Sequence, residues 1–205
     1  MKIEQKSNYH HEDLRNILIK TAMRMLTQNG LSGLSLRAVS KEAGVSHTAP
    51  YRHFRDKTDL LEAIAVHGYN YLADACHRAE EKYPAYPQQQ LFEAGMGYLS
   101  LVMKQPEIAH LMFSGTLSQE HCGETLSHAG DRAFQSLARI IENGKQLGIY
   151  EDRDTKDLCV TVLACIHGVA MMTLSGLIKR PKSKRQLKVL GERISDTLLL
   201  GLLTR

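Results

Sequence analysis

The sequence predicts an all-α fold, and three features of its 205 residues support this class. Apolar residues recur at helical spacing through most of the chain, no stretch alternates polar and apolar residues over the length of a strand, and glycine or proline closes several of the apolar stripes. The 43% hydrophobic content is sufficient for a folded core. We expect two helical domains, residues 1–56 and residues 57–205.

The first helix is predicted over residues 11–29. Leu14, Ile17 and Leu18 begin an apolar stripe that continues to Leu26, and Gly30 is suited to end the helix. Residues 1–8 are mostly polar or charged, and we expect them to form a mobile arm.

Residues 36–57, LRAVSKEAGVSHTAPYRHFRDK, are predicted to form a helix-turn-helix, which completes an N-terminal three-helix unit. Ser35 can cap the first helix of the pair, and Gly44 can adopt the positive φ of a sharp turn. Ser46 or His47 can cap the second, short helix. Pro50 is tolerated there because an amide hydrogen in the first turn mostly lacks an intrahelical partner. A unit of this kind fits the major groove of DNA.

The exposed face of the second helix combines short polar side chains with basic ones, as base edges and phosphates require. Arg52 can donate two hydrogen bonds to guanine, and Thr48 and Ala49 can contact a thymine methyl group. The residues expected to contact phosphate oxygens are Arg37, Tyr51, His53 and Lys57. Two polar residues, Ser46 and His47, complete the candidate DNA-binding set.

The charge distribution favours the same partner. Residues 1–60 hold 10 Lys and Arg against 6 Asp and Glu, whereas residues 61–205 hold 16 against 16. The net charge of +4 therefore lies entirely in the predicted DNA-binding end (10 − 6 = +4), which is the asymmetry that a nucleic-acid partner favours.

Residues 9–59 resemble the DNA-binding domain of the tetracycline-repressor-like (TetR/AcrR) transcriptional regulators. The resemblance lies in LRAV at residues 36–39, AGVS at residues 43–46 and PYRHFRDKTDL at residues 50–60. It implies a regulator that is not an enzyme and that binds a double-stranded DNA operator. It also implies that Tyr51, His53 and Lys57 contact the DNA backbone. The positions implied to vary with operator sequence are His47, Thr48, Ala49 and Arg52.

The rest of the chain is expected to form a helical ligand-binding and dimerisation domain. Helices are predicted over residues 58–82, 91–103, 106–115, 120–147, 155–178 and 184–203, with a break at YPAYPQQQ, residues 83–90. The last two helices have more apolar surface than one seam can bury, which predicts a four-helix bundle between two copies of the chain. A palindromic operator also requires a two-fold symmetric homodimer.

CIHGVA, residues 165–170, resembles the His-Gly signature of one C-terminal subgroup of the family, although that subgroup usually has a tryptophan shortly before it and this chain has no Trp. An apolar, methionine-containing pocket would suit a hydrophobic small-molecule effector. The alternative for each candidate residue of this pocket is that it is an ordinary core residue. For His167 the alternative is a neutral histidine that bonds to a backbone carbonyl. The candidates, chosen for apolar character and placement, are Tyr98, Met103, Met112, Phe113, Phe134, His167 and Met171.

No metal site or cofactor is expected, because the chain has neither an HxxxH nor a CxxC pattern. The four cysteines, Cys76, Cys122, Cys159 and Cys165, are scattered as free thiols are. We expect a cytoplasmic protein without a membrane partner, because the N-terminus lacks a signal peptide and no apolar run approaches the roughly 18 residues of a membrane span.

Two other classes remain open. One is a DNA-binding regulator controlled by a protein partner or by cysteine oxidation. The other is a small all-helical enzyme in which carboxylates such as Glu93, Glu107, Glu120, Glu124 and Asp131 perform acid–base chemistry.

Overall fold

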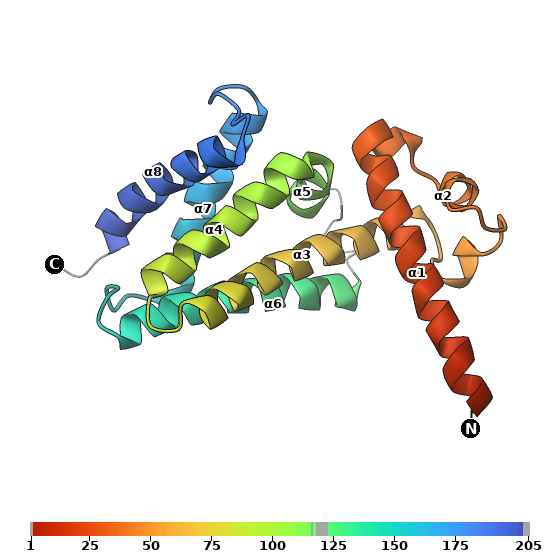
Figure 1. Cartoon of the computed structure of the whole chain (residues 1–205), viewed down its shortest axis with the longest axis horizontal. Helices are drawn as coiled ribbons and strands as arrows, with labels where there is room; N and C mark the ends of the chain where they lie inside the picture. The colour runs from red at the N-terminus through yellow and green to blue at the C-terminus, as the bar shows by residue number, and fades with distance from the viewer. Residues whose placement is uncertain (1, 116, 118–122, 203–205) are drawn as a thin grey trace. The chain divides into compact units, whose positions relative to one another are not determined.

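The computed structural model describes residues 2–115, 117 and 123–202, and the side chains within these ranges from residue 13 to residue 201. Every regular element of this part of the chain is a helix, which confirms the all-α class (Figure 1). The α-helices are α1 (Lys2–Asn29), α2 (Leu36–Glu42), α3 (Lys57–Lys82), α4 (Pro87–Lys104), α5 (Pro106–Phe113), α6 (Glu124–Gln146), α7 (Thr155–Leu174) and α8 (Lys184–Leu202). Two 3-10 helices, η1 (Leu31–Gly33) and η2 (Pro50–Arg52), lie on either side of α2 in the chain.

The chain divides into two compact units. The first contains residues 1–68 and 107–127, and the second contains residues 69–106 and 128–205. Helix α3 passes from the first unit into the second at residues 68 and 69, and α6 does so at residues 127 and 128, so two continuous helices cross the division.

The first unit is built around α1, which contacts α2 and η1. Helix α1 begins at Lys2 rather than at residue 11, which corrects the expectation of a mobile arm. Residues 2–29 contain neither glycine nor proline, so nothing in that stretch interrupts the helical backbone. The side chains that are at most 1% exposed and form the centre of this unit include Leu18, Leu26, Val39, Phe54, Leu60 and Ile64.

The ends of α1 and α2 follow the predicted local chemistry. Gly30 and Gly44 adopt φ angles of +65° and +69°, which only glycine takes without strain. The Ser35 hydroxyl accepts a hydrogen bond from the Ala38 amide at 3.1 Å and so caps α2. These contacts confirm the predicted cap and turn of the helix-turn-helix.

In the second unit, α4 contacts α7 and α8, and α7 also contacts α8 (Figure 1). A core cluster connects α3, α4, α6 and α7; its members are Cys76, Leu91, Ala94, Leu137, Ile140, Ile141, Tyr150, Leu158, Cys159 and Val162. Two glycines of this unit lie where a side chain would collide with a neighbouring helix. A Cβ at Gly97 would lie 2.7 Å from the Cβ of Ala75, and a Cβ at Gly191 would lie 2.4 Å from the Sδ of Met96. They let α4 approach α3 and α8 closely.

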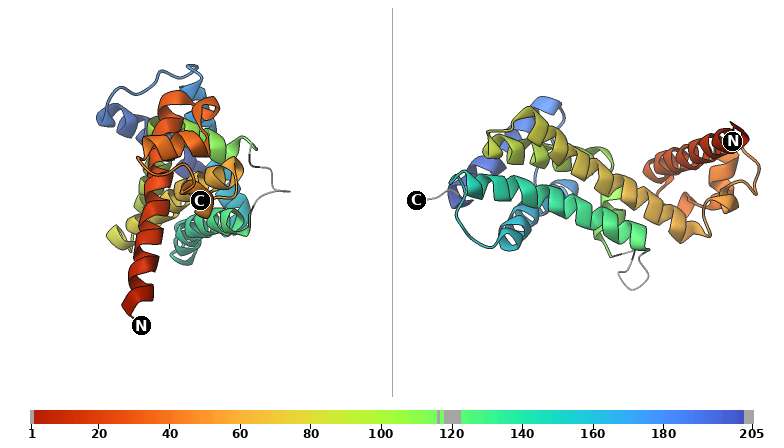
Figure 2. Two further views of the ribbon diagram at one scale, coloured as in Figure 1. Left: turned by 90° about the vertical axis from the view of Figure 1, so that its right-hand side faces the viewer. Right: turned by 90° about the horizontal axis from the view of Figure 1, so that it is seen from below.

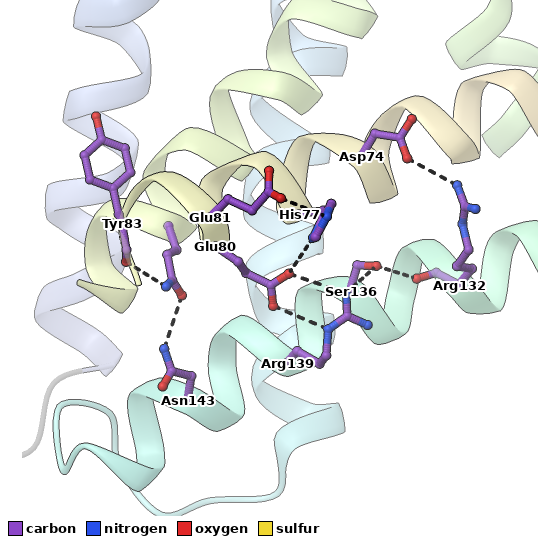
Figure 3. Close-up of polar contacts among 10 residues, drawn as sticks. Asp74, His77, Glu80, Glu81, Tyr83, Arg132, Ser136, Arg139 and Asn143 are labelled. Atoms are coloured by element: carbon purple, nitrogen blue, oxygen red, sulfur yellow. Dashed lines mark hydrogen bonds and ion pairs between the residues drawn. The ribbon is translucent and has the colours of Figure 1, made fainter. Parts of the chain in front are cut away.

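Helix α6 runs beside the C-terminal part of α3 (Figure 2), and polar contacts join the two helices. Figure 3 shows Arg132 of α6 facing Asp74 of α3, and Arg139 facing Glu80. The nitrogen–oxygen distance is 3.4 Å in both ion pairs. Each of these exposed pairs contributes about 0–1 kcal/mol. They set the register of α6 against α3 more than they stabilise it.

A buried amide fixes the turn between α3 and α4. Gln90 is 2% exposed, and its Nε2 donates to the Tyr83 carbonyl oxygen at 2.8 Å while its Oε1 accepts from Asn143 at 3.4 Å. Because both ends of the amide are bonded, burial leaves it satisfied.

Helix α7 is the one described helix whose 20-residue length and mean hydropathy of 1.8 would allow it to cross a membrane, by these two criteria alone. This corrects the expectation that no apolar run approaches a membrane span. An internal helix of a folded domain meets the same criteria, although only 33% of the apolar window is buried in this chain. The exposed remainder includes Val160 and Met172.

Candidate functional site

The segment that follows α2 forms a tight turn and a 3-10 helix rather than a second α-helix. Pro50 has no amide hydrogen, so the bond that an α-helix would make from residue 50 to the Ser46 carbonyl cannot form. Bonds to the third preceding residue replace it: the Ala49 amide donates to Ser46 at 3.0 Å, and the Arg52 amide donates to Ala49 at 3.2 Å. The prediction of a short helix is therefore right in position, but its winding is tighter. Neither Ser46 nor His47 caps η2, whose N-cap residue is Ala49.

Two buried residues anchor η2 to the first unit. Pro50 is buried, and Phe54 is 1% exposed with the Arg15 guanidinium 5.3 Å from its ring centre. A rigid base of this kind lets the intervening side chains face solvent without collapsing onto the core.

A reciprocal pair of hydrogen bonds then starts α3. The Asp56 carboxylate accepts from the Asp59 amide at 2.9 Å, and the Asp59 carboxylate accepts from the Arg55 amide at 3.0 Å. This arrangement resembles a capping box and satisfies two amides next to the first turn of the helix. Asp56 therefore acts as the cap of α3, and the two bonds fix the direction in which the chain leaves η2.

Six of the nine predicted DNA-binding side chains are exposed, and the other three are partly buried. The exposed ones are Arg37, Ser46, His47, Thr48, Tyr51 and Arg52. The partly buried ones are Ala49, His53 and Lys57. Tyr51 is 58% exposed, which is unusual for a tyrosine beside a core anchor and leaves its hydroxyl accessible to a ligand.

Lys57 has a structural contact that the sequence did not indicate. Its ammonium group donates to the Leu31 carbonyl oxygen at 2.7 Å and so joins the start of α3 to η1. The ammonium has three donors, so the bond to Leu31 leaves two of them for another acceptor. A change at Lys57 therefore removes a structural contact, independently of any role of this residue in DNA binding.

Arg55 was not among the predicted residues, yet its side chain is 83% exposed directly after η2. Its ion pair with Asp59 is 3.4 Å long and lies at the surface, where such pairs are weak. A basic residue beside the PYRHF stretch was the available sequence signal for a further phosphate contact.

The predicted effector residues fall in both units. Met112 and Phe113 of α5 belong to the first unit, where Met112 is 9% exposed and Phe113 is 37% exposed. The second unit holds the other five, which are Tyr98, Met103, Phe134, His167 and Met171.

Within the second unit, Tyr98 of α4 and His167 of α7 lie together. The Tyr98 hydroxyl and His167 Nδ1 are joined by a hydrogen bond of 2.6 Å, and the two rings meet edge to face with centres 6.3 Å apart. Tyr98 is 4% exposed, and burial raises the pKa of its phenol well above the usual value, so the hydroxyl stays protonated at neutral pH. The sequence suggested that His167 either lines the effector pocket or bonds to a backbone carbonyl. The structure adds a third contact, the hydrogen bond to the Tyr98 side chain.

Two grooves open on the second unit, with volumes of about 570 Å³ and 840 Å³. None of the predicted effector residues lines either groove. The first groove is lined instead by basic residues of α3, α4 and α8 together with apolar ones. The chain has a run of basic residues at 179–185, but nothing in the sequence indicates that part of it lies beside α3 and α4.

The cysteines divide by exposure. Cys165 is exposed, Cys76 and Cys159 are buried, and Cys122 lies outside the described residues. Burial raises the pKa of the Cys76 thiol to about 12 and that of Cys159 to about 11. Because the thiolate is the reactive form, both buried thiols are poor nucleophiles at neutral pH.

The described residues contain no group of three or more His, Cys, Asp and Glu side chains arranged to hold a metal ion.

Comparison with known proteins finds a family model that matches part of the first unit. Residues 18–64 match the family model "Bacterial regulatory proteins, tetR family". The transcriptional regulator AcrR of Shigella flexneri is 30% identical over 89 residues, which cover 43% of this chain and 41% of AcrR. The class C tetracycline repressor protein of Escherichia coli is 39% identical over 51 residues, which cover 25% of this chain and 23% of the repressor. The matched segments thus span less than half of these curated relatives.

Solved structures match the chain over nearly its whole length. A Rhodococcus sp. RHA1 protein of unknown function is 29% identical, with a TM-score of 0.81 and coverage of 93% of this chain and 96% of that one. A TetR family transcription regulator from Marinobacter aquaeolei VT8 is 18% identical, with a TM-score of 0.71 and coverage of 97% and 100%. At the latter identity the likeness shows the fold alone.

The relatives with stated roles are transcription regulators and not enzymes, which agrees with the expectation that this chain is not an enzyme. Neither comparison bears on the His-Gly subgroup. The matched segment coincides with the helix-turn-helix and its anchors, and the fold is shared over the whole chain. The chain is therefore similar to the bacterial regulatory proteins of the tetR family over residues 18–64, the segment that contains the helix-turn-helix.

Proposed function

We propose that the chain is a cytoplasmic, ligand-responsive transcriptional repressor that binds a palindromic operator as a homodimer. The observation that carries this proposal is the exposed segment between Gly44 and Phe54. It presents polar and basic side chains from a rigid base, within the part of the chain that matches the tetR family. Base edges in the major groove are read by such side chains on a fixed element.

The candidate DNA-binding residues divide by chemistry into those that would read bases and those that would contact the DNA backbone. Arg52 can donate two parallel hydrogen bonds to a guanine, while Thr48 and Ala49 offer methyl groups to thymine. The others, including Arg37, Tyr51 and Ser46, have donors suited to phosphate oxygens, which fix register without reading sequence. His47, His53 and Lys57 complete the proposed interface, and domain limits of 1–56 and 57–205 remain our prediction for its extent.

Exposed apolar side chains on the last two helices support the proposed homodimer. Val160 and Met172 of α7 are 52% and 44% exposed, and Val189 and Leu200 of α8 are 40% and 76% exposed. The same two helices of a second copy could cover them in a four-helix bundle. Such a dimer would need its two reading segments about 34–36 Å apart, one turn of DNA.

The proposed effector site uses Tyr98 and His167 as its polar group, because a hydrogen bond of 2.6 Å joins these two side chains between α4 and α7. Phe134, Met103 and Met171 would supply apolar walls for a hydrophobic effector, and Met112 and Phe113 remain candidates from the sequence. An effector that prefers one of two conformations by about 1–3 kcal/mol would change operator affinity five- to 150-fold. Helix α3 crosses from the first unit into the second and begins directly after the reading segment, so it is our proposed route by which occupancy reaches that segment.

The test is a fluorescence anisotropy titration of the protein against the DNA upstream of its own gene, with scrambled DNA at the same salt concentration. We expect the operator to bind in multiples of two protomers. Arg52→Ala should lower the ratio of operator to scrambled affinity, because a bidentate contact is worth about 1–3 kcal/mol of discrimination. Tyr51→Ala should weaken both DNAs equally.

Arg153→Ala is the matched control, since Arg153 is 65% exposed in the second unit and lies far from the reading segment in sequence. It should leave both affinities unchanged. If Arg52→Ala and Arg153→Ala discriminate equally well, Arg52 does not read bases. An upstream fragment that binds no better than scrambled DNA would contradict the choice of operator, and a monomer bound to each site would contradict the dimer.

A further inference from the structure

The groove of about 570 Å³ on the second unit combines basic rims with an apolar floor. Its basic residues are Arg78 and Lys82 of α3, Lys104 of α4, and Lys184 and Lys188 of α8. We propose that this groove binds a small amphiphilic anion, that is, a carboxylate or phosphate head carrying an apolar chain. The site is distinct from the proposed effector site, because neither Tyr98 nor His167 lines it.

The charge of the groove is strongly unbalanced. Five basic residues and one acidic residue, Glu93, line it, so its formal charge is +5 − 1 = +4. Glu93 lies 3.7 Å from Lys82, and Lys188 lies 3.5 Å from Glu192 outside the groove. Within the described part of the chain, Lys104 and Lys184 have no ion pair. Two ammonium groups thus remain available to an anionic head.

The position of α8 adds to this imbalance. A helix N-terminus carries a partial positive charge and favours acidic residues, yet the first turn of α8 has none. Instead, Lys184 and Arg185 begin the helix, and Lys188 follows one turn later. The Ser183 hydroxyl caps this helix end by accepting from the Gln186 amide at 3.2 Å, but no acidic residue in the first turn balances the basic ones. A bound anion would face the ammonium groups and offset this unfavourable placement.

The floor of the groove is apolar because its helices pack closely. Phe92 and Met96 of α4 and Leu187 of α8 line it and are each partly buried. Gly97 and Gly191 allow α3 and α8 to approach α4, which brings these side chains into one surface. Partly buried apolar groups beside unpaired ammonium groups suit a ligand with both properties.

A second groove, of about 840 Å³, has a mixed lining: Phe92, Ile149 and Leu199 are apolar, whereas Glu192 and Asp196 are acidic. It shares Lys82, Phe92, Glu93 and Lys188 with the first groove and extends to Leu199. The two grooves therefore adjoin one another along α4 and α8. A head group held by Lys104 and Lys184 could direct its chain toward Phe92 and beyond.

Isothermal titration calorimetry of the full-length protein tests the proposal with four probes, all below their micelle concentrations. Decanoate and decyl phosphate present the two possible heads on one chain, whereas decyltrimethylammonium reverses the charge and inorganic phosphate lacks the chain. We expect both anionic amphiphiles to bind, with the tighter one identifying the head. Shortening decanoate to hexanoate should weaken binding, by about fourfold for each methylene that is fully buried.

The decisive variant is Lys104→Gln combined with Lys184→Gln, which should weaken anionic amphiphiles about tenfold. Lys156→Gln combined with Lys179→Gln removes the same charge from exposed positions outside both grooves and should leave binding unchanged. Circular dichroism verifies that both double variants fold.

Three results would overturn the proposal. They are equal binding of decyltrimethylammonium and decanoate, equal binding of decanoate by the two double variants, and binding of inorganic phosphate as tight as that of decyl phosphate. Failure to bind DNA would leave this test intact, because amphiphile binding is measured without DNA.

Discussion

Replacing Lys57 with methionine should destabilise the first unit even when no DNA is present. The change keeps most of the side-chain stem and removes the ammonium that donates to the Leu31 carbonyl at 2.7 Å. Hydrogen bonds to charged groups contribute about 1.5–3 kcal/mol. The Leu31 oxygen also accepts from the Leu34 amide at 3.3 Å, so it is not left unpaired. We therefore expect a loss at the lower end, about 1.5 kcal/mol, or roughly a tenfold shift toward the unfolded state.

Amide hydrogen exchange in α1 and α2 is the suitable assay, because it reports on the first unit even if the second unfolds separately. Lys41→Met is the matched control: Lys41 is an exposed residue of α2, and its side chain has no hydrogen bond or ion pair within the described residues. It should change stability by less than about 0.5 kcal/mol. Equal protection of the two variants would refute a structural role for Lys57, and any loss of DNA affinity would then belong to phosphate contact alone.

Three further changes follow from particular contacts. Gly44→Ala should cost about 1–2 kcal/mol and weaken DNA binding, since the φ of +69° is strained for alanine although no atom lies within 4 Å of the new Cβ. Tyr98→Phe should cost about 0.5–1.5 kcal/mol in thermal unfolding by removing the hydrogen bond to His167. Raising the pH above about 9 should reduce the urea unfolding free energy. In the folded protein the pKa values of the Cys76 and Cys159 thiols are about 12 and about 11, whereas the unfolded thiols ionise at the ordinary pKa of 9.0.

Each change has its own check. Gly168→Ala is the control for Gly44→Ala, because Gly168 lies inside α7 at a helical φ with open space beside it, and alanine there should stabilise by up to about 1 kcal/mol. Equal effects of the two substitutions would contradict the strain at Gly44. Unchanged melting of Tyr98→Phe would mean that the bond to His167 adds no net stability. If the unfolding free energy did not change from pH 8 to 11, the burial of the thiols would be contradicted, because their raised pKa values require a loss of stability at high pH.

Local chemistry made the first unit predictable. The Ser35 cap involves an amide only three residues further along the chain, and the positive φ at Gly44 depends on the glycine itself. The local sequence therefore contained the cause of both features. The exposure of six of the nine candidate DNA-binding residues was predictable for the same reason, whereas their contact with DNA stays a prediction. The tighter winding of η2 could also have been anticipated, because Pro50 lacks the amide that an α-helix would need after Ser46.

The packing of the second unit was harder to predict from its sequence. Apolar spacing located α4, α6, α7 and α8 to within a few residues, but it did not show which faces would meet. The predicted effector residues were chosen by apolar character, and the units divide them, with α5 in the first and the others in the second. Nothing in the order of residues reveals that a break in contacts occurs at residues 68 and 69 within a continuous helix.

By itself, the sequence determined the helical class, the turn chemistry of residues 35–60 and the excess of positive charge at the N-terminal end, because each depends on neighbouring residues or on composition. Only the tertiary structure decided that Lys57 binds the Leu31 carbonyl, that Tyr98 meets His167 across 69 positions, and that basic residues from α3, α4 and α8 share one groove. Those contacts join residues far apart in the chain, and the packing of whole helices, which small residues such as Gly97 permit, brings them together.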